Sequence, residues 1–184
     1  MKKLTLKELI LIGNLAVLGL ICMPVFSPFF NLLTDFIRIP GGSATAGISI
    51  LFLVFAAALI RKPAAGLLTG FVQGVCSLAT GISAAAGVLV LLTYSIPGMV
   101  IDLIMHVPMK MNLKTRMMLA GSGGVLSGAA ATNILYYRMA WIPFLLFYLV
   151  GILSGALGGY IAWQILQRLP ESLKKGFGSY EKSN

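Results

Sequence analysis

The chain contains few charged residues, and acidic ones are especially rare. Of its 184 residues, 5 are Asp or Glu and 1 is His, whereas 58% are hydrophobic. A water-soluble domain needs far more polar surface than this composition supplies. The sequence therefore argues against a soluble enzyme or binding module and favours a protein embedded in a membrane.

Cysteine is scarce as well. Cys22 and Cys76 are the two cysteines, and both fall inside apolar stretches. Buried single cysteines behave as small hydrophobic residues. We therefore expect no disulfide and no thiolate metal site.

Several catalytic motifs are missing from the sequence. It contains no G-x-x-x-x-G-K-[ST] phosphate loop, no H-E-x-x-H and no G-x-S-x-G, so it lacks the groups that these motifs use to bind nucleotides or cleave bonds. The single histidine has no second carboxylate or thiol motif beside it, so no metal site is predicted. We expect a protein that is not an enzyme, holds no cofactor and binds no ATP itself.

Six apolar stretches are long enough to cross a membrane, since a helix spans about 30 Å of hydrocarbon with roughly 20 residues. They cover about 7–26, 43–60, 64–80, 86–105, 117–137 and 142–167. The predicted fold class is an all-α membrane protein, in which residues 1–184 form one bundle of six transmembrane helices. Residues 170–184 form a short tail.

Positive charge is distributed unevenly around these spans. Of the 14 Lys and Arg residues, only Arg38 and Arg138 fall in the predicted outer loops. Basic residues near span ends resist translocation, so both termini are predicted to be cytoplasmic. The net charge of +9 then serves topology and contact with anionic lipid headgroups, and no nucleic-acid partner is expected.

Three spans carry a small residue at every fourth position, which lays a flat ridge along one helix face. Such ridges allow helices to approach closely in lipid. They fit either static packing or an open face on which a partner docks. The ridges consist of Gly66, Gly70 and Gly74; Ala120, Gly124 and Gly128; and Gly151, Gly155 and Gly159.

A few polar and aromatic side chains lie inside the spans, toward the predicted outer half. Polar groups in hydrocarbon must face the bundle or a wet cavity. We predict a pocket for a small, flat, partly polar molecule, lined by Gln73, Tyr94, Asn133 and Tyr148. Phe30 and Phe36, in the apolar loop 27–42, would form its lid. Interhelical hydrogen bonding is the alternative role for the polar members.

Asp102 and His106 are spaced i, i+4 near the cytoplasmic end of the fourth span. They share one helix face, so they could relay a proton. They could instead pair with each other or with Lys110, or contact a cytoplasmic partner.

The chain resembles the substrate-binding S components of energy-coupling factor (ECF) vitamin transporters. The resemblance covers most of the chain, and its strongest local part is the glycine-rich region from Ile39-Pro-Gly-Gly-Ser43 through Arg61-Lys62-Pro63 to Gln73-Gly74. This region is similar to S components for thiamine and its pyrimidine precursor. Ile96-Pro97-Gly98 followed by Asp102 also fits the family's fourth span.

The resemblance implies a mechanism and partners. An S component binds a vitamin or precursor near the outer face of the prokaryotic plasma membrane. It then works with a membrane coupling subunit and two cytoplasmic ATPases, which bind the ATP. S components dock on the coupling subunit through small residues of the first span. The resemblance implies that Gly13, Ala16 and Gly19 have this role here.

Other interpretations remain open at this stage. The substrate could be thiamine, its pyrimidine precursor, another B vitamin, a queuosine precursor or an amino acid, and the ATPase module could be dedicated or shared. The chain could instead be an autonomous proton-coupled carrier that uses Asp102 and His106, or a scaffold held together by its glycine ridges.

Overall fold

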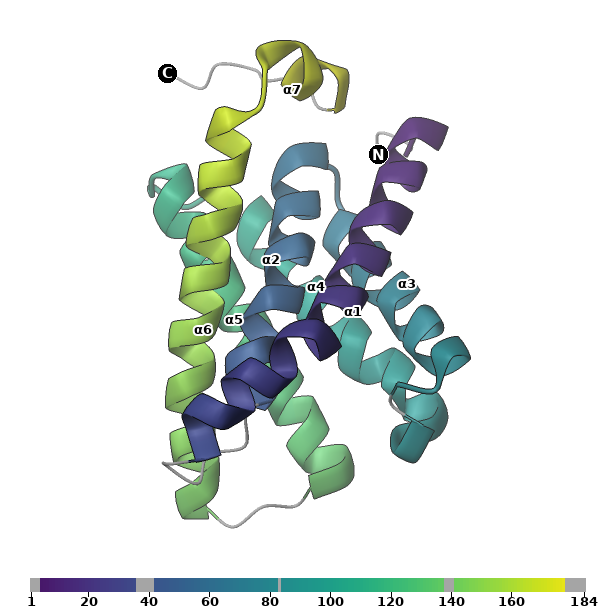
Figure 1. Cartoon of the computed structure of the whole chain (residues 1–184). Helices are drawn as coiled ribbons and strands as arrows, with labels where there is room; N and C mark the ends of the chain where they lie inside the picture. Colours follow the sequence, from purple (N-terminus) through teal and green to yellow (C-terminus); the bar gives the residue numbers. More distant parts are fainter. Residues whose placement is uncertain (1–3, 36–41, 83, 138–140, 178–184) are drawn as a thin grey trace.

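The computed structural model describes residues 4–35, 42–82, 84–137 and 141–177, and all regular structure within these ranges is helical (Figure 1). The α-helices are α1 (Leu6–Asp35), α2 (Gly42–Ile60), α3 (Ala65–Thr80), α4 (Val90–His106), α5 (Leu113–Thr132), α6 (Trp141–Arg168) and α7 (Glu171–Phe177). A 3₁₀ segment, η1 (Ala84–Leu89), precedes α4, and a π-helical turn, η2 (Asn133–Tyr137), follows α5. The six predicted spans thus correspond to α1–α6.

Four of the helical segments are long and apolar enough to cross a membrane. They are Leu6–Phe29, Gly87–His106, Leu113–Leu135 and Phe147–Arg168. Two shorter apolar helices, Thr45–Ile60 and Ala65–Thr80, accompany them. The first turn of α1 and the short helix α7 lie at the same end of the bundle (Figure 1).

The first helix is longer than the sequence predicts. We expected span 1 to end at about residue 26, because Pro24 and Pro28 lack the N–H donors that a helix needs. Instead α1 continues through both prolines to Asp35, so the predicted loop 27–42 is helical over its first half. Proline can bend a helix without ending it, and α1 changes direction along its length (Figure 1).

The fourth helix also runs through a proline. It is continuous from Val90 to His106 with Pro97 inside it, so this proline does not end the helix. The chain breaks earlier, at Gly87, where φ is 53° and ψ is −144°. A positive φ costs glycine little because it has no Cβ, which explains why the chain turns at this residue.

The helix α2 forms the centre of the bundle. It packs against α1, α3, α4, α5 and α6, and every residue from Leu53 to Ile60 is buried. A helix that is apolar on all sides belongs in the interior. The helices α1 and α3–α6 are therefore arranged around α2, and each exposes large apolar side chains on its outer face.

Glycines set the closest helix contacts. Gly121 of α5 faces Gly155 of α6, and an added Cβ on either residue would collide with the other's carbonyl oxygen. Likewise, Gly66 of α3 faces Gly98 of α4. The three predicted small-residue ridges all pack inside the chain in this way, so they are packing surfaces rather than open docking faces.

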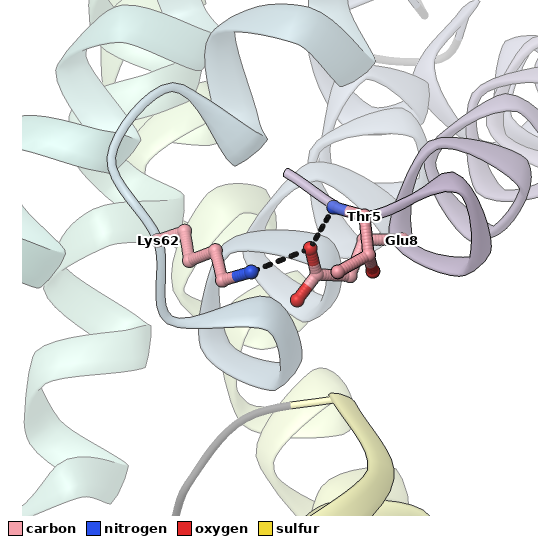
Figure 2. Close-up of polar contacts among 3 residues, drawn as sticks. All are labelled: Thr5, Glu8 and Lys62. Carbon is pink, nitrogen blue, oxygen red and sulfur yellow. Dashed lines mark hydrogen bonds and ion pairs between the residues drawn. The ribbon is translucent and has the colours of Figure 1, made fainter. Parts of the chain in front are cut away.

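A buried ion pair ties α1 to the turn between α2 and α3 (Figure 2). The Glu8 carboxylate accepts hydrogen bonds from Lys62 Nζ at 2.8 Å and from the Thr5 N–H at 2.7 Å. The exposed fractions of the two side chains are 5% for Glu8 and 15% for Lys62. The same turn contains two non-glycine residues with positive φ, Arg61 at 51° and Ala64 at 72°, so Glu8 stabilises a backbone that is otherwise unfavourable.

Candidate functional site

A group of uncharged polar side chains is buried between α2 and α3. Thr45 and Ser49 lie one turn apart on α2, and Gln73 and Ser77 lie one turn apart on α3. All four are at most 6% exposed. Because α2 and α3 run in opposite directions, the Ser49–Gln73 hydrogen bond puts Thr45 at the same level along the bundle as Ser77. We call these four residues the polar cluster.

Gln73 is the central member of the polar cluster. Its side chain is fully buried, and Ser49 Oγ donates a hydrogen bond to Gln73 Oε1 at 3.1 Å. Gln73 Nε2 is buried too, but it has no hydrogen-bond partner among the described residues. A buried amide donor without an acceptor is uncommon and costs about 1–3 kcal/mol, so this nitrogen is a candidate ligand contact.

Gly19 of α1 covers this unpaired nitrogen. A Cβ added at Gly19 would overlap Gln73 Nε2 and would come within 3.3 Å of the Phe52 ring of α2. Only a glycine lets α1 lie this close to the amide. The polar cluster is therefore enclosed by α1, α2 and α3.

Tyr94, the second predicted pocket residue, lies on α4. The Tyr94 carbonyl oxygen packs against Gly70, and the Tyr94 Cβ lies 3.4 Å from the Cβ position of Gly74. Tyr94 of α4 therefore packs against the Gly70 and Gly74 face of α3, whereas Gln73 contacts Ser49 of α2 and Gly19 of α1. That Gln73 and Tyr94 line one pocket stays a prediction.

Asn133 and Tyr148 lie on the other side of the bundle. Asn133 begins the π-helical turn after α5, and Tyr148 lies on α6 one turn before Gly151, which packs against Val125 of α5. Both residues are half-buried. The pairings of Gly124 with Ile101 and Gly128 with Pro97 set an antiparallel register that places Asn133 near the level of Tyr94.

The two predicted lid residues are Phe30 and Phe36. Phe36 and the side chain of Phe30 lie outside the part of the chain that the structure describes. Phe29, next to Phe30 on α1, is 59% exposed.

The three predicted docking residues have different environments. Ala16 is 0% exposed, and Gly19 packs on Gln73 and Phe52, so both are covered within the bundle. Gly13 has open space where a Cβ would be. Asn14, beside it, has an exposed side chain.

Asp102 has a structural partner that the sequence does not reveal. Its carboxylate accepts hydrogen bonds from the N–H groups of Gly66 at 2.9 Å and Leu67 at 2.8 Å. These donors lie in the first turn of α3, whose N-cap residue, Ala64, provides no side-chain cap. Asp102 therefore caps α3 from α4, where a negative charge is also favoured by the helix dipole.

His106 contacts the backbone of Asp102 rather than its carboxylate. His106 Nδ1 lies 2.8 Å from the Asp102 carbonyl oxygen, so Nδ1 carries the proton in this contact. Of the partners considered for this pair, the structure supports a local contact between the two residues.

Sequence reasoning missed three members of the polar cluster, namely Thr45, Ser49 and Ser77. A hydroxyl inside a span is common because it can bond to the carbonyl of its own helix, as Thr69 does with the Ala65 carbonyl. Their i, i+4 spacing was the available signal. That spacing indicates a shared polar surface only when α2 and α3 are known to face each other.

A solved protein structure has a similar fold. A solved structure described as "Crystal structure of an S-component of ECF transporter" matches 96% of this chain and 91% of its own, with a TM-score of 0.70 and 19% sequence identity. At that identity the likeness shows a shared fold. No curated protein matches the chain.

A family model gives the second match. It is described as "ABC-type cobalt transport system, permease component" and matches residues 7–131, which is well over half of the chain. Together with the apolar helices, these similarities indicate a multi-pass membrane protein and point to transport rather than catalysis. The chain belongs to the permease-component family of ABC-type cobalt transport systems.

Proposed function

We propose that this chain is the substrate-binding membrane subunit of an ECF-type transporter. It spans a prokaryotic plasma membrane six times with both termini in the cytoplasm. It binds a vitamin or vitamin precursor, thiamine-related compounds among the candidates, in the outer half of the bundle. The observation that carries the proposal is the polar cluster, where an enclosed amide lacks an acceptor.

ATP hydrolysis belongs to the partners in this proposal. A chain without nucleotide-binding motifs can accumulate a solute only by coupling to another protein or to an ion gradient. The partners are a membrane coupling subunit and two ATPases. Asp102 caps α3 with both carboxylate oxygens, which gives this residue a role that needs no proton coupling.

Docking on the coupling subunit is proposed for the face of α1 around Gly13. Among the glycines whose surroundings the structure describes, Gly13 is the one within an α-helix that has open space at its Cβ position. A small residue with no neighbour in its own chain leaves room for another helix. The exposed amide of Asn14 would be costly in lipid and offers that helix a hydrogen bond.

A pull-down tests the proposed partners. The tagged chain, purified from its native membrane in mild detergent, should recover one membrane coupling subunit and two ATPases. Gly13→Leu fills the open space and should abolish this recovery. Ala79→Leu adds the same bulk at an exposed position of α3 and should not.

Two results would contradict the proposal. Recovery of the chain alone, under conditions that preserve known membrane complexes, would favour an autonomous carrier. Saturable Co²⁺ binding by the chain would favour the cobalt named in the family description. The described residues contain no group of three or more His, Cys, Asp or Glu that could hold a metal ion.

A further inference from the structure

The polar cluster carries information about the chemistry of its ligand. Its four side chains are three hydroxyls and one amide, and none carries a charge. The group that lacks a partner is a donor, Gln73 Nε2. A ligand that completes this site must therefore present a hydrogen-bond acceptor, such as a carbonyl oxygen or an unprotonated ring nitrogen.

The buried carboxylates lie elsewhere and are already paired. Within the described part of the chain, Glu8 and Asp102 are the buried acidic residues. Glu8 binds Lys62, and Asp102 binds the first turn of α3. Gln73 lies six residues beyond Leu67, so it is about 9 Å further along α3. A cation beside Gln73 would thus be buried without a counter-charge, which is unfavourable.

We infer that the site takes an uncharged, acceptor-bearing heterocycle or amide, and that Gln73 Nε2 donates to its acceptor. The inference rests on the proposed function and narrows its substrate class. A permanently cationic compound such as thiamine and a metal ion such as Co²⁺ are both disfavoured. The neutral pyrimidine half of thiamine, with two ring nitrogens, fits the requirement.

Access to the site requires α1 to move. Gly19 of α1 covers the amide nitrogen, so a ligand that reaches it must displace α1 there. Pro24 and Pro28 follow Gly19 on the same helix, and each removes one backbone hydrogen bond. This makes the half of α1 beyond Gly19 easier to bend than an uninterrupted helix.

The test compares neutral and charged probes of matched shape. Thermal unfolding of the purified chain in detergent is measured with two pairs of probes. The neutral 4-amino-5-hydroxymethyl-2-methylpyrimidine is compared with cationic thiamine, and neutral nicotinamide is compared with cationic 1-methylnicotinamide. Riboflavin and Co²⁺ complete the panel. At least one neutral probe should raise the melting temperature in a saturable way, because a ligand that binds only the folded state stabilises it, and the charged probes should not.

Variants separate a ligand contact from a structural role. Gln73→Leu should weaken binding of the stabilising neutral probe at least tenfold, yet change the ligand-free melting temperature little, because removal of an unpaired donor offsets the loss of the hydrogen bond from Ser49. Thr69→Val, one turn away on α3, should leave affinity unchanged, because the Thr69 hydroxyl already bonds to its own helix.

The outcomes distinguish this inference from the proposed function. Stabilisation by thiamine, 1-methylnicotinamide or Co²⁺ alone would overturn the substrate class. Unchanged affinity in Gln73→Leu, or no stabilisation by any probe in a chain that still recovers its coupling subunit and ATPases, would overturn the inference while the proposed function stands. No stabilisation together with no partner would overturn both.

Discussion

Single glycines in this bundle have different roles, and their surroundings separate them. Gly121 faces the backbone of Gly155, whereas Gly13 faces open space. A methyl group at Gly121 would force α5 and α6 apart. A methyl group at Gly13 would only restrict the backbone. The two residues therefore make a matched pair for substitution.

Gly121→Ala should destabilise the protein by about 1–3 kcal/mol, the usual cost of overpacking. Gly13→Ala should be neutral or stabilise the isolated chain by up to about 1 kcal/mol, because alanine is the better helix former. Unfolding of the purified variants in detergent measures both changes. Equal destabilisation by the two substitutions would contradict the assigned contacts.

The site residues show how far sequence reasoning reaches at this scale. Gln73 stands out in the sequence because a primary amide in a span must find a partner. Its partner Ser49 does not, since a serine can satisfy itself within its own helix. The spacing of Asp102 from His106 is visible in the sequence, but the partners of the Asp102 carboxylate are backbone N–H groups of α3, which no sequence pattern indicates.

Among the helical elements, α3 depends most clearly on a neighbour. Its first turn has no side-chain cap of its own, and a carboxylate from α4 supplies one. The α2–α3 turn before it contains the unfavourable φ angles of Arg61 and Ala64. The start of α3 is therefore fixed by tertiary contacts rather than by its local sequence.

Removing this cap should weaken α3. Asp102→Ala loses both hydrogen bonds and leaves two buried N–H groups unpaired, so a destabilisation of about 2–4 kcal/mol is expected, at about 1–2 kcal/mol for each lost bond. Asp102→Asn keeps one acceptor oxygen and should cost less. Thermal unfolding and hydrogen exchange of the α3 amides give the measurement.

A different result would support the proton-coupled carrier. In that case Asp102→Asn would leave the unfolding midpoint and the α3 exchange rates unchanged but would abolish uptake. A loss of uptake that follows the loss of stability would instead agree with a capping role.

The boundaries of helices were predicted well where apolar runs end at charged turns. The predicted spans 43–60 and 64–80 match α2 and α3 closely, because Arg61 and Lys62 cannot remain in hydrocarbon. The end of α1 was predicted wrongly, because a proline was expected to stop the helix. In a long apolar helix, Pro24 and Pro28 are accommodated.

At the scale of the whole molecule, the distribution of positive charge predicts the orientation of the chain in the membrane. The first turn of α1 and the helix α7 lie at the same end of the bundle (Figure 1), and the side of the membrane on which that end lies stays a prediction. The order of packing around α2 could not be read from the sequence, because every span presents small residues to some neighbour.

Cysteine labelling tests the orientation. Ile82→Cys lies in the predicted outer loop after α3, and Lys110→Cys lies in the predicted inner loop after α4; both positions are exposed. A membrane-impermeant maleimide applied to intact cells should label Ile82→Cys and should reach Lys110→Cys only after permeabilisation. The reverse pattern would contradict cytoplasmic termini.

The most direct test of the central claim is uptake into proteoliposomes. The chain is reconstituted with the coupling subunit and ATPases recovered with it, and the probe that stabilises it best is supplied in radiolabelled form. We expect accumulation that requires both the partners and ATP on the cytoplasmic side. Accumulation by the chain alone, driven by a proton gradient and independent of ATP, would contradict the account.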